Sequence, residues 1–216
     1  MLRHDTPRRI AGKPLFDAPR EIVGRRRHTY GSPRQRSDAD RELDRASYLA
    51  AQASYGSKAH EEKLLRLGYG LDTELSGDKY RVYSHPERAI VAYRGTQLND
   101  LQDLSDDLGI ATANYNTSGF KSGREIADAA RKKYNSPIHH AGHSLGGTKA
   151  LTNARYYGET ATAFNPGSSP IGLNAGDNSV YISRGDVITG RLRGSNITEV
   201  PGSTHTISQY ESMFEE

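Results

Sequence analysis

The sequence predicts one α/β domain, in which a mostly parallel central sheet carries helices on both faces. Two observations predict this fold class. Residues 89–93, Ala-Ile-Val-Ala-Tyr, form a nearly continuous apolar run that is typical of a strand buried on both faces. After this run, strand-like and helix-like segments alternate along the chain, which indicates strands joined by crossover helices. A length of 216 residues is enough for one such domain with a substantial core.

The first 37 residues differ from the rest of the chain in charge. They hold ten Lys and Arg against three acidic residues, whereas residues 38–216 hold 19 bases and 23 acids. Four prolines interrupt residues 1–37, and the apolar residues there show no sustained period. We therefore interpret residues 1–37 as a basic N-terminal arm without a core of its own, and residues 38–216 as the folded domain.

The densest basic patch of this arm is Arg25-Arg26-Arg27. A solvated tail accounts for such a patch, and so does attraction to an anionic membrane surface, a nucleic acid or an acidic protein surface. Because Phe16 and Tyr30 are the only Phe, Tyr or Trp residues of the arm, nothing favours sequence-specific recognition of nucleic acid.

Composition excludes several classes of protein. The chain has no cysteine, so it forms neither disulfides nor thiolate metal sites. No apolar run approaches the ~18–20 residues of a membrane-spanning helix, and the first residues lack the apolar core of a secretory signal. We expect a soluble protein that is not exported by the signal-peptide route, lies inside a cell or a particle, and needs no cofactor or metal.

In the first half of the domain, the sequence predicts two helices and two strands. Ser37, followed by two aspartates, is typical of a helix N-cap and predicts a helix that runs to about residue 54. A second helix is predicted for residues 58–67. Residues 79–84 alternate as a half-buried strand does, and a turn joins them to the strand of residues 89–93.

In the second half of the domain, short apolar runs predict strands, and the segments between them have the apolar spacing of helices. The predicted helices cover residues 122–134, 148–154 and 206–214, and the predicted strands cover residues 138–141, 161–164 and 179–183.

Between one of these strands and the helix after it lies Gly142-His143-Ser144-Leu145-Gly146, a Gly-x-Ser-x-Gly motif. Glycines allow a tight strand-to-helix turn, which lifts the Ser144 hydroxyl clear of the sheet. The same turn aims the Leu145 N–H, at a helix N-terminus, toward the place where an oxyanion would form. A loop that merely caps a helix is the alternative, but the flanking strand and helix favour a nucleophile elbow.

This motif, with Gly147 after it, resembles the elbow of the fungal-type (class 3) lipases, a family of the α/β-hydrolase superfamily. The resemblance extends from about residue 45 to the C-terminus and implies a compact, α/β-hydrolase-like fold. Residues 90–96 resemble the family's strand that ends in Arg-Gly-Ser/Thr, which implies that Thr96 supplies a second oxyanion-hole donor beside Leu145. Leu104 stands where the family usually has tryptophan.

The resemblance also suggests a role for the segment that follows Thr96. Its leucines recur at helical spacing with aspartates between them, at Leu98, Leu101, Leu104 and Leu108. In the family this region is the lid over the active site. An ordinary amphipathic helix packed on the body explains the pattern equally well, and the aspartates are more typical of a solvated face than of a cation site.

The order serine, acid, histidine along an α/β-hydrolase chain selects the partners of Ser144. His205 is the only histidine after Ser144, so it is the candidate base. Asp186 follows the strand of residues 179–183 and lies at the carboxyl edge of the sheet, whereas Asp177 precedes that strand. Gly185-Asp186-Val187-Ile188 also resembles the family's Asp-x-Val-Pro element. The histidines of the elbow segment are interpreted as structural: His139, His140 and His143.

Together these features predict a serine ester hydrolase that acts on lipid, an acylglycerol or a glycerophospholipid, through a Ser144–Asp186–His205 triad and an acyl-enzyme. An alternative is a lipase-like structural component of a particle or virion, docked through its basic arm, with activity secondary or lost. The arm motivates this alternative, because an enzyme of this kind needs no such extension. Hydrolysis of a thioester or a peptide by the same residues is a third possibility.

Overall fold

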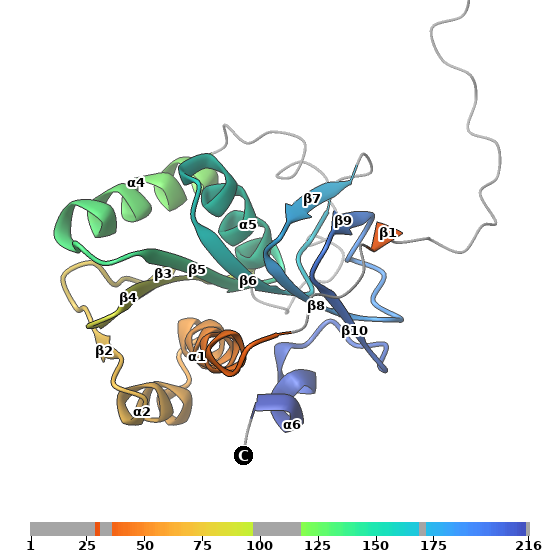
Figure 1. The fold of residues 1–216 in the computed structure, drawn as a ribbon, viewed down its shortest axis with the longest axis horizontal. Helices are drawn as coiled ribbons and strands as arrows, with labels where there is room; N and C mark the ends of the chain where they lie inside the picture. Colours follow the sequence, from red (N-terminus) through yellow and green to blue (C-terminus); the bar gives the residue numbers. More distant parts are fainter. Residues whose placement is uncertain (1–28, 31–35, 97–117, 169–171, 215–216) are drawn as a thin grey trace, which may run out of the picture.

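The computed structural model of the protein describes residues 29–30, 36–96, 118–168 and 172–214 (Figure 1). The predicted lid, residues 98–108, lies outside the described residues. So does most of the predicted arm, including Arg25-Arg26-Arg27. The division into arm and domain, and the partners suggested for the arm, therefore stay predictions.

A seven-stranded sheet forms the centre of the described part of the chain, in the strand order β10-β8-β6-β5-β4-β3-β2. Its strands are β2 (Gly70–Leu71), β3 (Tyr80–His85), β4 (Arg88–Tyr93), β5 (Ile138–His143), β6 (Thr160–Phe164), β8 (Ser179–Ser183) and β10 (Ile197–Val200). From β4 to β10 every neighbouring pair is parallel, and only the pairs of β3 with β4 and with β2 are antiparallel. The predicted mostly parallel sheet is confirmed.

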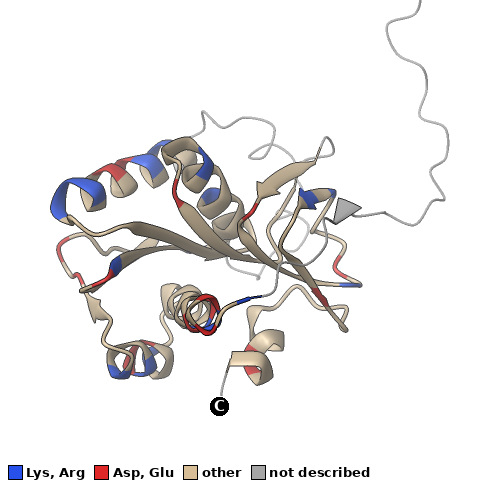
Figure 2. Cartoon of the chain, in the orientation of Figure 1, with Lys and Arg blue, Asp and Glu red and all other residues tan. Residues whose placement is uncertain are grey.

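Helices cover both faces of this sheet (Figure 1). One face carries α4 (Ser118–Lys133) and α5 (Leu145–Tyr157). The other carries α1 (Asp38–Ser54), α2 (Lys58–Arg66) and α6 (Glu211–Phe214), which follows the 3-10 turn η1 (Ile207–Tyr210). The arrangement is the α/β-hydrolase-like fold that the sequence predicts. Strands β5 and β6 carry no charged side chains, and the charges of the described residues lie mainly on helices and loops (Figure 2).

Three helices differ from the prediction. The helix predicted for residues 148–154 is longer and runs from Leu145 to Tyr157. The helix predicted from residue 122 begins at Ser118. Phe120, in its first turn, is buried, so packing of this side chain favours the earlier start. The helix predicted for residues 206–214 is a 3-10 turn followed by one short α-helix.

A small second sheet accounts for strands that the sequence analysis missed. It contains β1 (Thr29–Tyr30), β9 (Leu192–Gly194) and β7 (Leu173–Gly176), all paired in parallel. These strands are two to four residues long, too short for alternation to predict. Residues of the predicted arm therefore pair with the body of the domain through β1.

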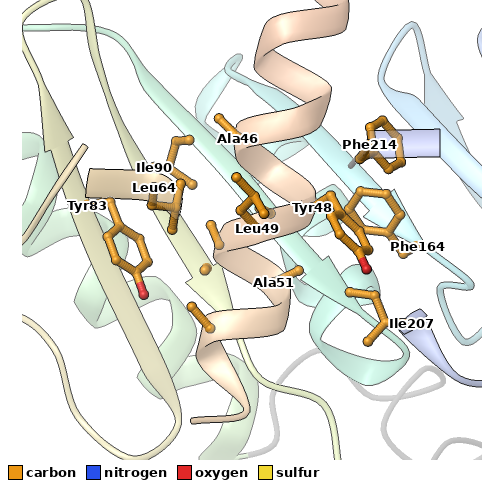
Figure 3. Packing of buried hydrophobic residues seen from close by; sticks show 14 of the residues in the cluster. Ala46, Tyr48, Leu49, Ala51, Leu64, Tyr83, Ile90, Phe164, Ile207 and Phe214 are labelled. Carbon is orange, nitrogen blue, oxygen red and sulfur yellow. The ribbon is translucent and has the colours of Figure 1, made fainter. Parts of the chain in front are cut away.

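The core consists of two clusters, one on each face of the sheet. On the α1 face, the Tyr48 ring stacks on Phe214 at 5.2 Å and meets Phe164 edge-on at 5.8 Å (Figure 3). Alanines along α1, such as Ala46 and Ala50, are fully buried, so the helix backbone lies close to the sheet. Ser37 and Asp40 form the capping box at its start, in agreement with the predicted N-cap.

A buried carboxylate joins α1 to the sheet and to the end of the predicted arm. Asp44 is 1% exposed and accepts hydrogen bonds from Thr162 (2.8 Å) and from the Tyr181 hydroxyl (2.9 Å). It also forms an ion pair with Arg36, whose guanidinium lies over the Tyr181 ring. Arg36 is thus packed against the domain, whereas sequence reasoning counted it in the arm.

Replacing Asp44 with alanine should destabilise the protein by roughly 3–5 kcal/mol, because the partly buried Arg36 would lose its counter-charge and the hydroxyls of Thr162 and Tyr181 would lose their acceptor. Denaturant unfolding measures the change. Glu42→Ala removes an exposed acid from the same helix and should change the free energy of unfolding by no more than about 0.5 kcal/mol. Equal effects of the two substitutions would contradict the importance of the buried pair.

Candidate active site

Ser144 lies in a strained turn between β5 and α5. Its φ of 57° and ψ of −128° make it one of two non-glycine residues with positive φ in the described part of the chain. The flanking glycines are required by contact distances. A Cβ on Gly142 would lie 2.3 Å from the Gly146 carbonyl oxygen, and a Cβ on Gly146 would lie 2.1 Å from the Tyr93 carbonyl oxygen. The motif therefore forms the tight strand-to-helix turn that the sequence predicts.

The structure brings Ser144, His205 and Asp186 together at the carboxyl edge of the sheet. His205 Nε2 lies 2.8 Å from the Ser144 Oγ, and His205 Nδ1 lies 2.6 Å from an Asp186 carboxylate oxygen. All three residues are less than 10% exposed. With the ring proton on Nδ1, the histidine donates to the carboxylate and accepts from the serine hydroxyl. This geometry is that of a nucleophile, a base and an orienting acid.

Asp186 is held in its charged form. Burial alone would raise its pKa, but hydrogen bonding and the charge of His205, together with the Ile188 N–H and the Thr189 hydroxyl, lower the pKa below its usual value. The last two donors each lie 2.9 Å from the carboxylate.

The end of β4 lies directly against Ser144. A Cβ on Gly95 would lie 2.7 Å from the His143 carbonyl oxygen and 3.1 Å from the Ser144 Cβ. Thr96, the next residue, is partly exposed, and Leu145 is the first residue of α5. Leu145 therefore follows Ser144 directly in the chain, and Thr96 follows Gly95, which packs against Ser144. Both are the residues predicted for the oxyanion hole.

Tyr55 is a site residue that sequence reasoning missed. Its hydroxyl lies 2.9 Å from His143 Nδ1 and accepts the Gly95 N–H, and burial raises its pKa above the usual value. Tyr55 thus connects the end of α1 to the elbow and to the strand end that carries Thr96. The sequence showed it only as the end of a helix, because the contact spans 88 residues of chain.

A second missed group supports the acid and the base. Asn165 has a φ of 40°, and its side-chain oxygen accepts from the Ser183 N–H (2.8 Å) and from the Tyr210 hydroxyl (2.6 Å). Asn165 follows β6, Ser183 ends β8 three residues before Asp186, and Tyr210 lies shortly after His205. One buried amide therefore joins the three segments around the site.

The elbow-segment histidines are buried, in agreement with their interpretation as structural residues. His139 contacts the hydroxyls of Thr160 and Thr162, and burial lowers its pKa to about 3. His140 lies between Tyr93 and Glu159. Burial, followed by the charge of His205, lowers the pKa of His143 to about 3, so its ring is neutral beside His205.

One buried cation lies on the helix that follows the nucleophile. Lys149 is 6% exposed. Burial, and then the charges of Lys79 and Arg94, lower its pKa from 10.5 to about 8. A group of three or more His, Cys, Asp or Glu able to hold a metal ion is not found among the described residues. Within the same residues, no helix has the length and apolar character needed to cross a membrane.

Substituting Gly146 with alanine should destabilise the fold by about 1–3 kcal/mol or more, because the added methyl group would overlap the Tyr93 carbonyl. Thermal unfolding monitors the effect. Gly77→Ala is the matched control, since a Cβ there meets nothing within 4 Å. A Gly146→Ala protein as stable as the Gly77→Ala protein would refute the close packing of α5.

Lys149→Met should alter how stability depends on pH. Between about pH 8 and 10.5 the unfolded chain keeps a proton that the folded chain releases, so wild-type stability rises with pH relative to the variant. Keeping Lys149 protonated in the folded protein costs at most ~3 kcal/mol, at 1.36 kcal/mol per pKa unit. Lys149→Met does not carry this cost, so the variant should be the more stable protein near neutral pH.

Urea unfolding of both proteins at about pH 7 and about pH 10 tests this expectation. Lys132→Met, at an exposed position of α4, should leave the pH dependence of stability as it is in the wild type. Parallel pH profiles for wild type and Lys149→Met would disprove it.

Known proteins similar to this chain fall among lipid-ester hydrolases. Residues 46–177 match the family model described as phospholipase-like, Tle-like phospholipase domain. The extracellular phospholipase A1 of Serratia liquefaciens is 32% identical over 114 residues, which are 50% of this chain and 35% of that protein. The chain thus spans about a third of the length of this curated relative.

Comparison with solved structures finds partial similarity to lipases. The lipase of Rhizopus microsporus var. chinensis is 14% identical, with 79% of this chain and 78% of that chain covered and a TM-score of 0.42. The Rhizomucor miehei lipase, in its complex with propeptide, is 12% identical, with 81% and 72% covered and a TM-score of 0.45.

The resemblance to lipases of the α/β-hydrolase superfamily that the motifs predicted is confirmed by the family match. That match covers more than half of the sequence. The protein therefore belongs to the phospholipase-like family, with a Tle-like phospholipase domain.

Proposed function

We propose that this protein is a serine ester hydrolase that acts on lipid through an acyl-enzyme. The observation that carries the proposal is the continuous hydrogen-bonded line from the Ser144 hydroxyl through His205 to Asp186. A serine hydroxyl is a weak nucleophile unless a base takes its proton, and the base must be oriented. In this protein His205 is placed to act as the base, and Asp186 is placed to orient it.

The reaction begins when His205 Nε2 takes the proton of Ser144 as its Oγ attacks the ester carbonyl. Asp186 orients the ring and stabilises the imidazolium that forms. Its lowered pKa keeps it negative at neutral pH, as this role requires. The imidazolium then gives its proton to the leaving alcohol, and an acyl group remains on Ser144. Water, activated by His205 in the same way, releases the acid.

The negative charge that develops on the carbonyl oxygen needs donors that are already in place. We assign the backbone N–H groups of Leu145 and Thr96 to this role. Leu145 lies at the N-terminus of α5, where unpaired N–H groups and the helix dipole favour an anion. Thr96 follows Gly95, which packs against Ser144. The loss of one such donor typically lowers kcat ~10²–10³-fold.

Glycerophospholipids are the substrate class that we favour over acylglycerols. The family description names a phospholipase domain, and the Serratia liquefaciens relative is named a phospholipase A1. The structural or assembly role of the predicted arm stays a prediction, because most of the arm lies outside the described residues.

Ser144→Ala should lower the kcat for a medium-chain chromogenic ester and for a phospholipid by about 10⁴–10⁶-fold, and Asp186→Asn by about 10⁴-fold. A fluorescent organophosphonate should label the wild-type protein on Ser144 and leave Ser144→Ala unlabelled.

The matched control is Ser195→Ala, which removes an exposed hydroxyl between β9 and β10 and should keep both activity and labelling. Turnover that survives in Ser144→Ala, or wild-type protein without turnover or label, would rule out the proposed hydrolase.

A further inference from the structure

The Tyr55 hydroxyl reaches the candidate active site from the end of α1. Tyr55 is the C-cap of this helix, and its hydroxyl lies 2.9 Å from Nδ1 of His143, the last residue of β5. His143 directly precedes Ser144 and is 1% exposed. The hydrogen bond therefore joins α1 to the residue that leads into the elbow.

The same hydroxyl also touches the end of β4. A Cβ on Gly95 would lie 2.6 Å from the Tyr55 hydroxyl oxygen. It would also lie 2.7 Å from the His143 carbonyl oxygen and 3.1 Å from the Ser144 Cβ. The Gly95 N–H donates to the Tyr55 hydroxyl. The strand end, the elbow and the tyrosine of α1 are therefore packed around one backbone position, which directly precedes Thr96.

The His143 ring is in turn a neighbour of the candidate base. Its centroid lies 5.0 Å from that of the His205 ring, at an interplanar angle of 41°. Burial, followed by the charge of His205, lowers the pKa of His143 to about 3. His143 is therefore uncharged at neutral pH, and it packs against His205 without competing for the proton that Ser144 gives up.

The hydrogen-bonding capacity of a tyrosine determines the direction of these bonds. A phenol hydroxyl has one proton to donate, and its oxygen can accept a further bond. Since the Tyr55 oxygen accepts the Gly95 N–H, its own proton is available to His143 Nδ1. Nδ1 accepts only when the ring proton is on Nε2, so the bonds indicate this tautomer for His143. One hydroxyl thus contacts both the strand end and the histidine beside the base.

A purely structural role is the plain alternative, because a buried hydroxyl and a buried imidazole stabilise a fold when each satisfies the other. The chain offers a direct comparison. The Tyr93 hydroxyl also lies 2.9 Å from a histidine Nδ1, that of His140. Tyr93 belongs to the core cluster on the other face of the sheet, which α4 and α5 cover (Figure 1). The second pair is therefore the same kind of bond on the face away from Tyr55.

We propose that Tyr55 is a positioning residue for the proposed ester hydrolysis. Through His143 it holds the His205 ring. Through Gly95 it holds the strand end that carries Thr96. The inference rests on the proposed hydrolase function and adds to the same site a residue that acts through its neighbours rather than on the ester itself.

Both groups that Tyr55 holds must be in place before the ester reacts. The base has to stay within hydrogen-bonding distance of the serine hydroxyl, and an oxyanion-hole donor has to point at the charge that develops. A misplacement of about 1 Å can lower a rate ~10²-fold. Because these interactions strengthen in the transition state, loss of the Tyr55 hydroxyl should appear in kcat rather than in KM.

Tyr55→Phe, assayed in the full-length chain, keeps the ring and removes only the hydroxyl. With a medium-chain chromogenic ester it should lower kcat about 10–100-fold and change KM less than about twofold. Tyr93→Phe is the matched control, because it breaks the equivalent bond to His140 and leaves the Tyr93 carbonyl against Gly146 in place. It should keep kcat within about twofold of wild type. Thermal unfolding shows whether each variant is folded at the assay temperature.

Two substitutions at His143 test the other end of the bond, and they decide the question if Tyr55→Phe does not fold. His143→Asn can offer a side-chain oxygen to the Tyr55 hydroxyl, whereas His143→Leu has no acceptor. The Leu variant should lose kcat as Tyr55→Phe does, and the Asn variant should recover part of that loss. In the double variant Tyr55→Phe/His143→Leu, the loss should be smaller than the product of the two single losses, because both act on one bond.

The outcomes separate this inference from the function on which it rests. Wild type that hydrolyses no ester would refute the hydrolase proposal, and the positioning role with it. Active wild type with no loss of kcat in Tyr55→Phe, or with equal losses in Tyr55→Phe and Tyr93→Phe, would overturn the positioning role and leave the hydrolase intact. A loss expressed only as a raised KM would overturn it too, and so would a His143→Asn protein no more active than His143→Leu.

Discussion

The close approach of α5 to the ends of β4 and β5 is the constraint on which the rest of the site depends. It is possible only because Gly142 and Gly146 have no side chains where the helix and the strands touch. The same contact forces Ser144 into a backbone conformation with positive φ, which side chains rarely adopt. The strain is thereby concentrated at the residue whose hydroxyl must stand clear of the sheet, and α5 presents its N-terminus beside that hydroxyl.

Long-range hydrogen bonds hold the remaining parts of the site around this turn. Asn165 joins the ends of β6 and β8 to η1, and Tyr55 joins the end of α1 to the elbow. Each of these groups is polar and lies close to the apolar cluster on the α1 face. A polar group in such a place is stabilising only when its partners are present. These bonds reach the site through its neighbours, since Ser183 accepts the Asp186 N–H (3.1 Å) and the His143 ring lies 5.0 Å from the His205 ring.

Two different electrostatic environments lie near one edge of the sheet. Asp186 is a buried charge that hydrogen bonds satisfy, and its pKa is lowered. Lys149 is a buried charge that faces two further cations, and its pKa is also lowered, which for a base means that the charged form is disfavoured. The first environment suits a permanent part of a reaction centre.

Local pattern was enough to predict five strands of the central sheet and the helices that cover it, because buried parallel strands are apolar and their crossover helices are periodic. The edge strands β2 and β10 were not predicted. The motif selected Ser144, the order of residues along the chain selected His205, and the carboxyl edge of the predicted sheet selected Asp186; the structure brings the three together. Only the tertiary structure revealed Tyr55, Asn165 and the surroundings of Lys149, since each depends on residues distant in sequence. The same holds for the short strands β7 and β9 and for the early start of α4, where packing against neighbours, rather than local preference, decides the backbone.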